Sequence, residues 1–226
     1  MLATRRLRDA IEAYLGAEAA TRVGIGLADT SSRAEGLWPS EQTATGGMVE
    51  KRLREFAAGR AAARLAMAEL GVDASGVPMA ADRAPIWPEG LTGSITHTDL
   101  HALSLVAFRR DMRAIGVDLE DAVPLAPDLW NIVLSGAETA SVSGGIAAKR
   151  IFSAKEAVFK AQYPVTGRLL GFLDVEVVLT KTGFAARIEP HSPGLPETLN
   201  GLSVVADDVI LSVLSIPETG ANGYDA

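Results

Sequence analysis

Residues 151–161 read IFSAKEAVFKA, an apolar segment that carries Lys155, Glu156 and Lys160. The spacing predicts a helix, because Glu156 and Lys160 are four residues apart with the acid first, the favourable order for a helical ion pair. Ser153 stands three residues before Glu156, which fits a capping box, and we expect Ser153 to cap the helix. Structural roles alone explain this segment, so its charges need support from the rest of the chain before any chemistry is assigned to them.

The size and composition are those of an ordinary globular protein. The 226 residues suffice for one large domain or for two domains, and 48% of them are hydrophobic while 22% are charged. No apolar run approaches the ~20 residues that span a bilayer, and the first residues lack the apolar centre of a secretion signal, so we expect a cytoplasmic protein. The absence of cysteine excludes disulfides, thiolate catalysis and cysteine-ligated zinc.

The charge is distributed unevenly. The net charge of −7 argues against a general nucleic-acid binder, which needs a basic surface. Basic residues nevertheless gather in one short stretch, at Lys51, Arg52, Arg54, Arg60 and Arg64. This stretch indicates that an anionic ligand of modest size can bind there.

The order of the expected elements favours an α+β fold. We expect helices at 44–70 (ended by Gly71), 128–141 and 146–162 (ended before Pro164), a loop at 72–93, and strands at 103–108, 114–120, 173–180, 183–189 and 208–216. Helices and strands come in blocks without regular alternation, which is typical of antiparallel sheets. We therefore expect two pseudo-symmetric lobes, residues 1–112 and 113–226, each with helices packed on a small antiparallel sheet and with the active site in the cleft between them.

The stretch GVDLE at 116–120 is a candidate metal site. In a strand, alternate side chains face opposite sides, so Val117 and Leu119 would face the core while Asp118 and Glu120 share the other face. Two adjacent carboxylates repel each other, and Mg²⁺ relieves that repulsion because it prefers oxygen ligands. The alternative is a strand end whose two acids simply lie in water.

The stretch GSITHT at 93–98 is a candidate phosphate contact, because His97 and the Thr96 hydroxyl can both donate hydrogen bonds. His97 and His101 also have the spacing of a zinc-peptidase pair, but that motif needs a helix with a Glu directly after the first His. Thr98 occupies that place, which makes zinc the weaker interpretation. A hydrogen-bonded structural histidine is the other alternative.

The order of these segments resembles one enzyme family. KRLREFAAGRAAAR, PIWPEGLTGSITHT, GVDLE and FSAKEAVFKAQYPVTGRLLGF follow one another as in the 4′-phosphopantetheinyl transferases, most closely the enterobactin synthase component D-like branch, over roughly residues 45–180. The resemblance implies a two-lobed α+β enzyme that uses coenzyme A and Mg²⁺, or Mn²⁺ in its place. Such an enzyme transfers the phosphopantetheine arm to a serine of an apo acyl or peptidyl carrier protein and releases adenosine 3′,5′-bisphosphate. The branch implies siderophore or other nonribosomal peptide biosynthesis.

The resemblance also implies roles for individual residues. Glu156 resembles the base that takes the serine proton, and Lys160 resembles the residue that steadies the pyrophosphate and the leaving group. The implied metal ligands are Asp118, Glu120 and Glu156. The implied coenzyme A contacts are Arg52, Arg60, Arg83, Thr96, His97, Asp118, Lys155 and Lys160. Because such a site is completed within one chain, we expect a monomer.

Three positions depart from the family pattern. Thr98-Asp99-Leu100 follows His97 where a glycine is usual, Asp82-Arg83 replaces a basic residue and a glycine, and Leu169 stands where an aromatic is common. Two other functions remain open. One is a Mg²⁺-dependent phosphohydrolase built on the same acids, and the other is a non-catalytic module that binds coenzyme A or a carrier protein.

Overall fold

The computed structural model describes residues 2–31 and 36–218. The chain divides into two compact units. We call residues 15–115 with 216–226 the N-terminal unit, and residues 1–14 with 116–215 the C-terminal unit. The short elements of the described chain are α2 (Ala17–Ala20), α3 (Pro39–Gln42), η1 (Pro127–Leu129), α5 (Trp130–Val133), α6 (Gly136–Ser141) and η2 (Phe172–Asp174).

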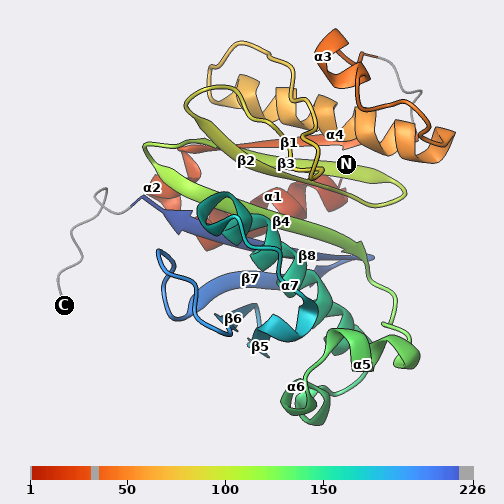
Figure 1. Cartoon of the computed structure of the whole chain (residues 1–226), viewed down its shortest axis with the longest axis vertical. Helices are drawn as coiled ribbons and strands as arrows, with labels where there is room; N and C mark the ends of the chain where they lie inside the picture. The colour runs from red at the N-terminus through yellow and green to blue at the C-terminus, as the bar shows by residue number, and fades with distance from the viewer. Residues whose placement is uncertain (1, 32–35, 219–226) are drawn as a thin grey trace. The chain divides into compact units, whose positions relative to one another are not determined.

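The N-terminal unit is a helix packed on a three-stranded antiparallel sheet of order β1-β3-β2. Its strands are β1 (Val23–Asp29), β2 (Leu91–His97) and β3 (His101–Phe108), and α4 (Glu50–Glu69) lies across them (Figure 1). Gly24 and Gly26 allow this packing, because a Cβ at either position would lie 1.9 Å from a carbonyl oxygen of α4. The alanines Ala62, Ala63 and Ala66 are fully buried, so α4 presents small side chains to the sheet.

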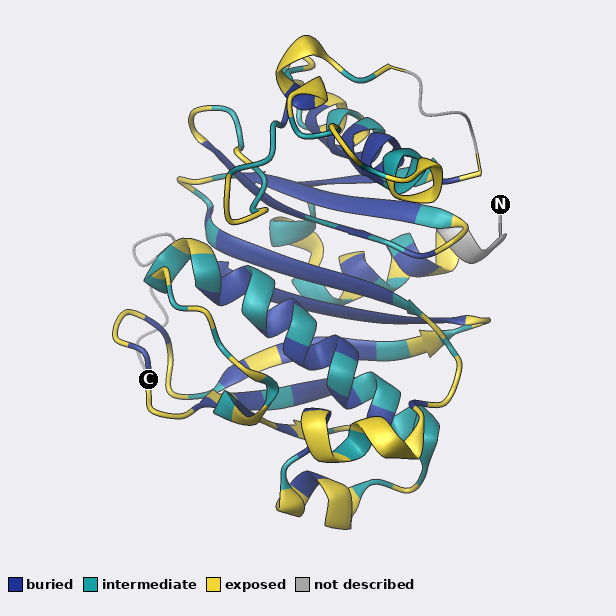
Figure 2. Cartoon of the chain, turned by 45° about the vertical axis from the view of Figure 1, so that its right-hand side comes forward, coloured by how far each residue is buried: buried dark blue, intermediate teal, exposed yellow. Residues whose placement is uncertain are grey.

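The C-terminal unit contains a five-stranded sheet of order β4-β8-β7-β6-β5. The strands are β4 (Met112–Asp121), β5 (Val175–Leu179), β6 (Gly183–Ile188), β7 (Leu199–Ala206) and β8 (Val209–Pro217), and α7 (Gly145–Thr166) runs along one face of the sheet (Figure 1). The close approach is made at Gly116, where a Cβ would lie 1.9 Å from the Ala157 carbonyl oxygen. Figure 2 shows that much of the sheet and the sheet-facing side of α7 are buried, whereas α5 and α6 are largely exposed.

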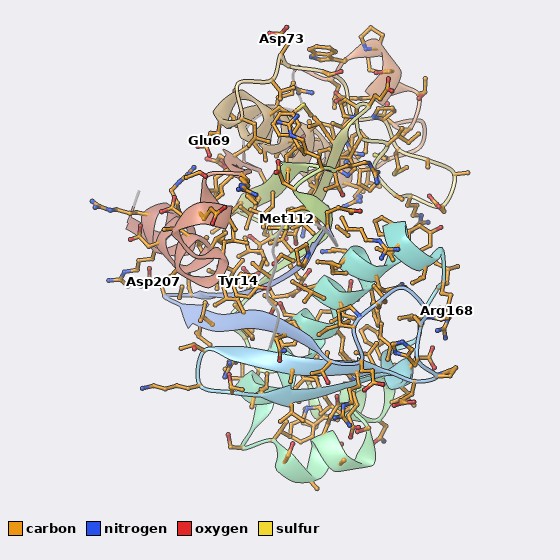
Figure 3. All side chains as sticks on the ribbon, turned by 90° about the vertical axis from the view of Figure 1, so that its left-hand side faces the viewer. Tyr14, Glu69, Asp73, Met112, Arg168 and Asp207 are labelled. Carbon is orange, nitrogen blue, oxygen red and sulfur yellow. The ribbon has the colours of Figure 1, made fainter. Side chains whose placement is uncertain are left out.

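Helix α1 (Leu2–Leu15) also belongs to this unit, apart from its last residue. Leu7 and Ile11 are 1% and 0% exposed, so the helix buries an apolar stripe. The Tyr14 hydroxyl (labelled in Figure 3) lies 3.1 Å from the Asn200 carbonyl oxygen and 3.2 Å from Ser215 Oγ. These contacts tie the first helix to β7 and β8.

The α+β class with antiparallel sheets is confirmed, but several expected boundaries were wrong. The first long helix starts at Glu50, because Gly47 has a positive φ of 83° and the preceding residues form turns. The expected helix 128–141 is broken into η1, α5 and α6. Strands β1, β2 and β7 were not expected. No helix within the described residues combines the length and apolarity that crossing a membrane requires.

Two expectations for α7 were also wrong. Ser153 does not cap a helix, because α7 begins eight residues earlier in the chain, at Gly145, and Ser153 is fully buried within it. The helix does not end before Pro164 but continues to Thr166, and Gly167 ends it in the left-handed conformation. Pro164 removes only one hydrogen bond near the helix end, so the loss is small there.

Candidate functional site

Asp118 and Lys160 form an ion pair between β4 and α7. Lys160 Nζ donates to Asp118 Oδ1 at 2.8 Å and to the Val117 carbonyl oxygen at 3.0 Å. Asp118 is only 4% exposed, whereas the Lys160 side chain is 28% exposed. The strand positions the acid and the helix brings the cation, with the glycine at 116 setting how closely they approach.

Glu120 lies on the same face of β4, as the alternation predicted, and Lys149 is its partner at 2.5 Å. Burial raises the pKa of Glu120, the hydrogen bond from Lys149 lowers it, and the charge of Asp118 raises it. The two carboxylates therefore lie close enough to repel each other, and each has a lysine of α7 beside it.

Glu156 faces the same two acids. Burial raises the pKa of Glu156, the nearby Lys160 ammonium lowers it, and the charges of Asp118 and Glu120 raise it. The structure thus brings together all three predicted metal-site acids and the predicted catalytic lysine. We call Asp118, Glu120, Glu156 and Lys160 the acidic cluster.

The acidic cluster fits a cation that takes only part of its ligands from protein. Among the described residues, no three His, Asp or Glu side chains are set close enough to hold a metal unaided. Mg²⁺ commonly binds one or two carboxylates and completes its shell with water and substrate phosphates. The oxygen donors on β4 and α7 suit this mode of binding, in which the substrate supplies the remaining ligands.

Lys155 is the predicted site residue that the structure places elsewhere. Its side chain is 0% exposed, and Nζ donates to Glu138 Oε2 at 2.7 Å and to the carbonyl oxygens of Val133 and Phe172 at 2.8 Å. Burial lowers the pKa of Lys155, and the hydrogen bond to Glu138 opposes that shift. All three ammonium hydrogens are used inside the unit, so the structure leaves Lys155 no hydrogen for the coenzyme A contact expected of it.

In the N-terminal unit, Arg52 and His97 meet at the first turns of α4. Arg52 Nη1 lies 2.5 Å from His97 Nε2 and 3.2 Å from Glu55 Oε2. Because a guanidinium only donates, Nε2 is the acceptor here and the ring proton is on Nδ1. The side chains of Arg52 and His97 are 46% and 29% exposed, so an anion can reach both.

Arg60 is held more tightly than Arg52. Its guanidinium stacks on the Phe56 ring at 3.9 Å, and Nε donates to the Val77 carbonyl oxygen at 2.9 Å. Burial lowers the pKa of Arg60 to about 10, the charge of Glu41 raises it, and Arg52 and Arg64 lower it. The side chain remains charged at neutral pH and keeps its planar fork for oxygen pairs.

Thr96 and Arg83, the other predicted phosphate contacts of this unit, lie in β2 and in a turn of the loop before it. Thr96 is adjacent to His97 in β2 and therefore points to the opposite face of the sheet, where it is 5% exposed. Arg83 is exposed, with a positive φ of 71°, in a turn where its N–H donates to the Ala80 carbonyl oxygen.

We call Arg52, Arg60 and His97 the basic cluster.

The segment after His97 is a hairpin turn. Thr98 Oγ1 accepts from the backbone N–H groups of Leu100 and His101 at 3.3 and 3.2 Å, and Asp99 pairs with Lys51 at 2.6 Å. A turn between strands excludes the helix that a zinc-peptidase pair needs. Leu169, another of the three departures from the family pattern, is 85% exposed.

Sequence reasoning missed two partners of the site. Glu55 accepts from Arg52, and its spacing of three residues on a helix is a signal that could have found it. Lys149 neutralises Glu120, and its position two turns before Glu156 on the same helix places it on the same face.

Comparisons with known proteins match both halves of the chain to one kind of enzyme. A family model of the 4′-phosphopantetheinyl transferase N-terminal domain matches residues 40–107, and that of the 4′-phosphopantetheinyl transferase superfamily matches residues 114–204. The chain is 36% identical over 143 residues to the 4′-phosphopantetheinyl transferase Npt of Nocardia iowensis, covering 62% of this chain and 64% of that protein.

Two further relatives extend this comparison. The 4′-phosphopantetheinyl transferase Svp of Streptomyces mobaraensis is 36% identical over 70% of this chain and 68% of its own length. Enterobactin synthase component D of Escherichia coli (strain K12) is 35% identical over 57% of this chain and 62% of its own length. The chain spans just under two thirds of the length of two of these relatives, 64% of the Nocardia protein and 62% of the Escherichia coli protein.

Proposed function

The chain belongs to the 4′-phosphopantetheinyl transferase superfamily, and we propose that it moves the phosphopantetheine arm of coenzyme A to a serine of an apo carrier protein. Members of this family use coenzyme A and act on carrier proteins. The observation that carries the proposal for this chain is the acidic cluster, in which the acids of β4 and the Glu156–Lys160 pair of α7 face one another.

The reaction needs one bond to form and one to break. The serine oxygen forms a bond to the phosphorus that bears the pantetheine arm, and the bond from this phosphorus to the bridging pyrophosphate oxygen breaks. The serine proton passes to the Glu156 carboxylate, directly or through a water, and adenosine 3′,5′-bisphosphate leaves with the bridging oxygen. A carboxylate that acts as base must lie within hydrogen-bond reach of the hydroxyl and beside a cation. Glu156 has the Lys160 ammonium nearby as that cation.

The remaining groups of the acidic cluster serve charge and position. Mg²⁺ held by one or two of the carboxylates of Asp118, Glu120 and Glu156, with the substrate supplying further oxygens, would neutralise the pyrophosphate oxygens when it is bound. Lys160 is partly exposed and can add a hydrogen bond to the leaving phosphate, since phosphoryl transfer depends mainly on positioning and on charge neutralisation. Asp118 orients Lys160 through their 2.8 Å contact.

Coenzyme A carries a terminal phosphate as well as its pyrophosphate, and we assign phosphate binding to the basic cluster. Arg60 offers two terminal nitrogens in a fixed plane, and Arg52 beside His97 offers a second, more exposed guanidinium. Thr96 and Arg83 have weaker support as contacts, because Thr96 is buried on the opposite face of β2 from His97 and Arg83 has no described contact with the basic cluster.

The substrate protein is inferred from the relatives. Because enterobactin synthase component D is among them, we propose a carrier of siderophore or other nonribosomal peptide biosynthesis. One chain supplies every group named above, so we propose that the protein acts as a monomer. We also propose that it acts in the cytoplasm.

Intact-protein mass spectrometry of an apo peptidyl carrier domain tests the transfer. With this protein, coenzyme A and Mg²⁺, the carrier should gain roughly 340 Da, and EDTA should abolish the gain. A panel of acyl and aryl carriers identifies the preferred partner. Coenzyme A binding without any mass gain would support a non-catalytic module, and coenzyme A cleavage without a carrier would support a phosphohydrolase.

A second measurement tests the metal without relying on activity. Mg²⁺ bound to the folded state should raise the melting temperature of the protein in the presence of coenzyme A, because ligands that bind only the native state stabilise it. Asp118→Asn should remove most of that Mg²⁺-dependent rise. An unchanged rise in this variant would contradict Asp118 as a metal ligand.

A further inference from the structure

Glu41 is a buried carboxylate that the transfer reaction does not explain. It lies in the four-residue helix α3, and its side chain is 0% exposed. Arg64 Nη1 donates to both of its oxygens, at 2.9 and 3.1 Å, and the Trp38 N–H donates to Oε2 at 2.9 Å. A carboxylate buried this completely is expected to be fully hydrogen-bonded. Glu41 accepts from one further donor, which belongs to a residue that contacts Arg60 of the basic cluster.

That donor is the backbone N–H of Val77, which bonds to Glu41 Oε1 at 2.9 Å. Directly before it in the chain is Gly76, and directly after it is Pro78, which has no N–H of its own. The carbonyl oxygen of Val77 accepts from Arg60 Nε, also at 2.9 Å. Val77 is itself fully buried in the core of the N-terminal unit. One residue of the loop therefore has its N–H bound by Glu41 and its carbonyl bound by Arg60.

The contacts of Arg60 show why this residue matters. The guanidinium is limited to one plane by the Phe56 ring and to one rotation by the bond from Nε to Val77. No described residue accepts a hydrogen bond from its two terminal nitrogens, and these nitrogens form the edge that suits a phosphate. If the Val77 carbonyl moved, Nε would lose its acceptor and the edge would turn away.

We propose that Glu41 is a positioning residue for phosphate binding, which holds Val77 so that its carbonyl oxygen fixes the guanidinium of Arg60. The proposal rests on the proposed function, because it assumes that Arg60 binds a phosphate of coenzyme A. Its consequence is that Glu41 of α3 and the backbone of Val77 contribute to coenzyme A affinity through Arg60.

A double-mutant cycle tests the proposal with calorimetry of coenzyme A binding to the full chain in Mg²⁺. The variants are Glu41→Gln, Arg60→Ala and the double variant. A glutamine has one accepting oxygen where Glu41 uses two, so it cannot serve Arg64, Trp38 and Val77 together. We expect Glu41→Gln to raise the dissociation constant by about 5-fold, and by less than about 2-fold when Arg60 is already alanine.

The calorimetric stoichiometry separates positioning from folding. A variant that only loses folded protein binds fewer equivalents of coenzyme A with the same dissociation constant, whereas lost positioning changes the constant at full stoichiometry. Glu69→Gln is the matched control, because Glu69 is another carboxylate of this unit that accepts a backbone N–H, from Ile25 at 3.0 Å. It should leave the dissociation constant unchanged. Glu41→Asp provides a milder second variant if Glu41→Gln reduces the stoichiometry.

The outcomes separate the two proposals. If Arg60→Ala does not weaken coenzyme A binding, the phosphate role of Arg60 is wrong and the inference falls with it. If Arg60→Ala weakens binding but both Glu41 variants bind like the wild type, only the inference is overturned. It is also overturned if Glu41→Gln weakens binding equally with and without the Arg60 side chain, because Glu41 then acts by another route.

Discussion

Glu156 and Lys160 lie one turn apart on α7 and are engaged differently. Lys160 gives its ammonium to Asp118 and to the Val117 carbonyl oxygen of β4, while Glu156 faces the other acids and is influenced by the Lys160 charge. A helix by itself would favour a pair between the two residues. The strand beside the helix offers Lys160 a more buried acid, and Lys160 bonds to Asp118 instead of Glu156.

Glu156→Gln should abolish transfer while the protein stays folded. The amide keeps the size of the side chain but cannot take up the serine proton, and it is a poorer metal ligand. We expect transfer to fall by at least about 100-fold in the carrier mass assay. The melting temperature should not fall, because the variant removes a buried charge that lies near two other acids.

The control for this prediction is Glu176→Gln, which makes the same carboxylate-to-amide change at an exposed position of β5. It should transfer at the wild-type rate. If Glu156→Gln retained more than half of the wild-type activity, Glu156 would be neither the base nor a metal ligand.

At the scale of elements, the acidic cluster depends on how closely α7 approaches β4. Gly116 permits this approach, since a Cβ there would lie 1.9 Å from the Ala157 carbonyl oxygen and 2.8 Å from the Ala161 nitrogen. The N-terminal unit uses the same device twice, with Gly24 and Gly26 of β1 under α4. In both units, glycines in a strand let the strand backbone pack directly against the helix backbone.

Gly116→Ala should therefore damage stability and activity together. The added methyl group meets backbone atoms, which cannot swing aside like a flexible side chain, so α7 must shift. We expect a loss of about 2 kcal/mol or more in the free energy of unfolding, measured by urea denaturation. Gly136→Ala is the control, because nothing lies within 4 Å of its added Cβ. Equal stability of the two variants would show that the approach of α7 is not limiting.

A second element-scale feature is the buried pair of Lys155 and Glu138. Lys155 joins α7 to α5 and η2 through backbone carbonyl oxygens, and Glu138 Oε1 accepts the Val177 N–H of β5 at 2.7 Å. Ser135 and Glu138 also cap α6 reciprocally. The pair therefore connects five elements of the C-terminal unit around the middle of α7.

Lys155→Met should destabilise the protein, because it leaves the Glu138 charge buried without its cation. Removing one partner of a buried pair typically costs about 3–5 kcal/mol. The melting temperature should fall strongly, and the double variant Lys155→Met with Glu138→Gln should recover part of the loss. A direct contact of Lys155 with coenzyme A predicts instead weaker coenzyme A binding at unchanged stability, and calorimetry distinguishes the two results.

At the scale of the whole molecule, the C-terminal unit is discontinuous in sequence. Its sheet is formed by the second half of the chain, yet α1 supplies Leu7, Ile11 and Tyr14 to the same unit. The Tyr14 hydroxyl accepts from the Ser215 N–H at 3.1 Å and also contacts the Asn200 carbonyl oxygen. Folding of this unit must therefore close a long chain loop, which is entropically costly.

Tyr14→Phe should lower the stability of this unit by about 1 kcal/mol, because the backbone partners of the hydroxyl lose hydrogen bonds that are only partly shielded from water. The fluorescence of Trp130 reports on this unit if Trp38 and Trp87 are first replaced by phenylalanine. Urea denaturation followed through Trp130 should then shift to lower urea concentration. An identical midpoint would mean that water replaces the tyrosine contacts without loss.

The fold class and the family could be read from the amino-acid sequence, and so could the pairing of the candidate acids. Strand alternation placed Asp118 and Glu120 on one face, and the spacing of four residues placed Glu156 and Lys160 together. These patterns are local, so they can be read from neighbouring residues. The boundary between the two lobes, expected after residue 112, remains a prediction.

The environment of each charged side chain became known from the folded structure alone. Lys155 and Glu156 are adjacent in the motif, yet the first is enclosed by Glu138 and two carbonyl oxygens while the second faces the acidic cluster. Ser153 matched a cap by spacing, but the helix had already begun at Gly145. Burial and long-range partners determine these roles, because the cost of an ionised group depends on which distant residues surround it after folding.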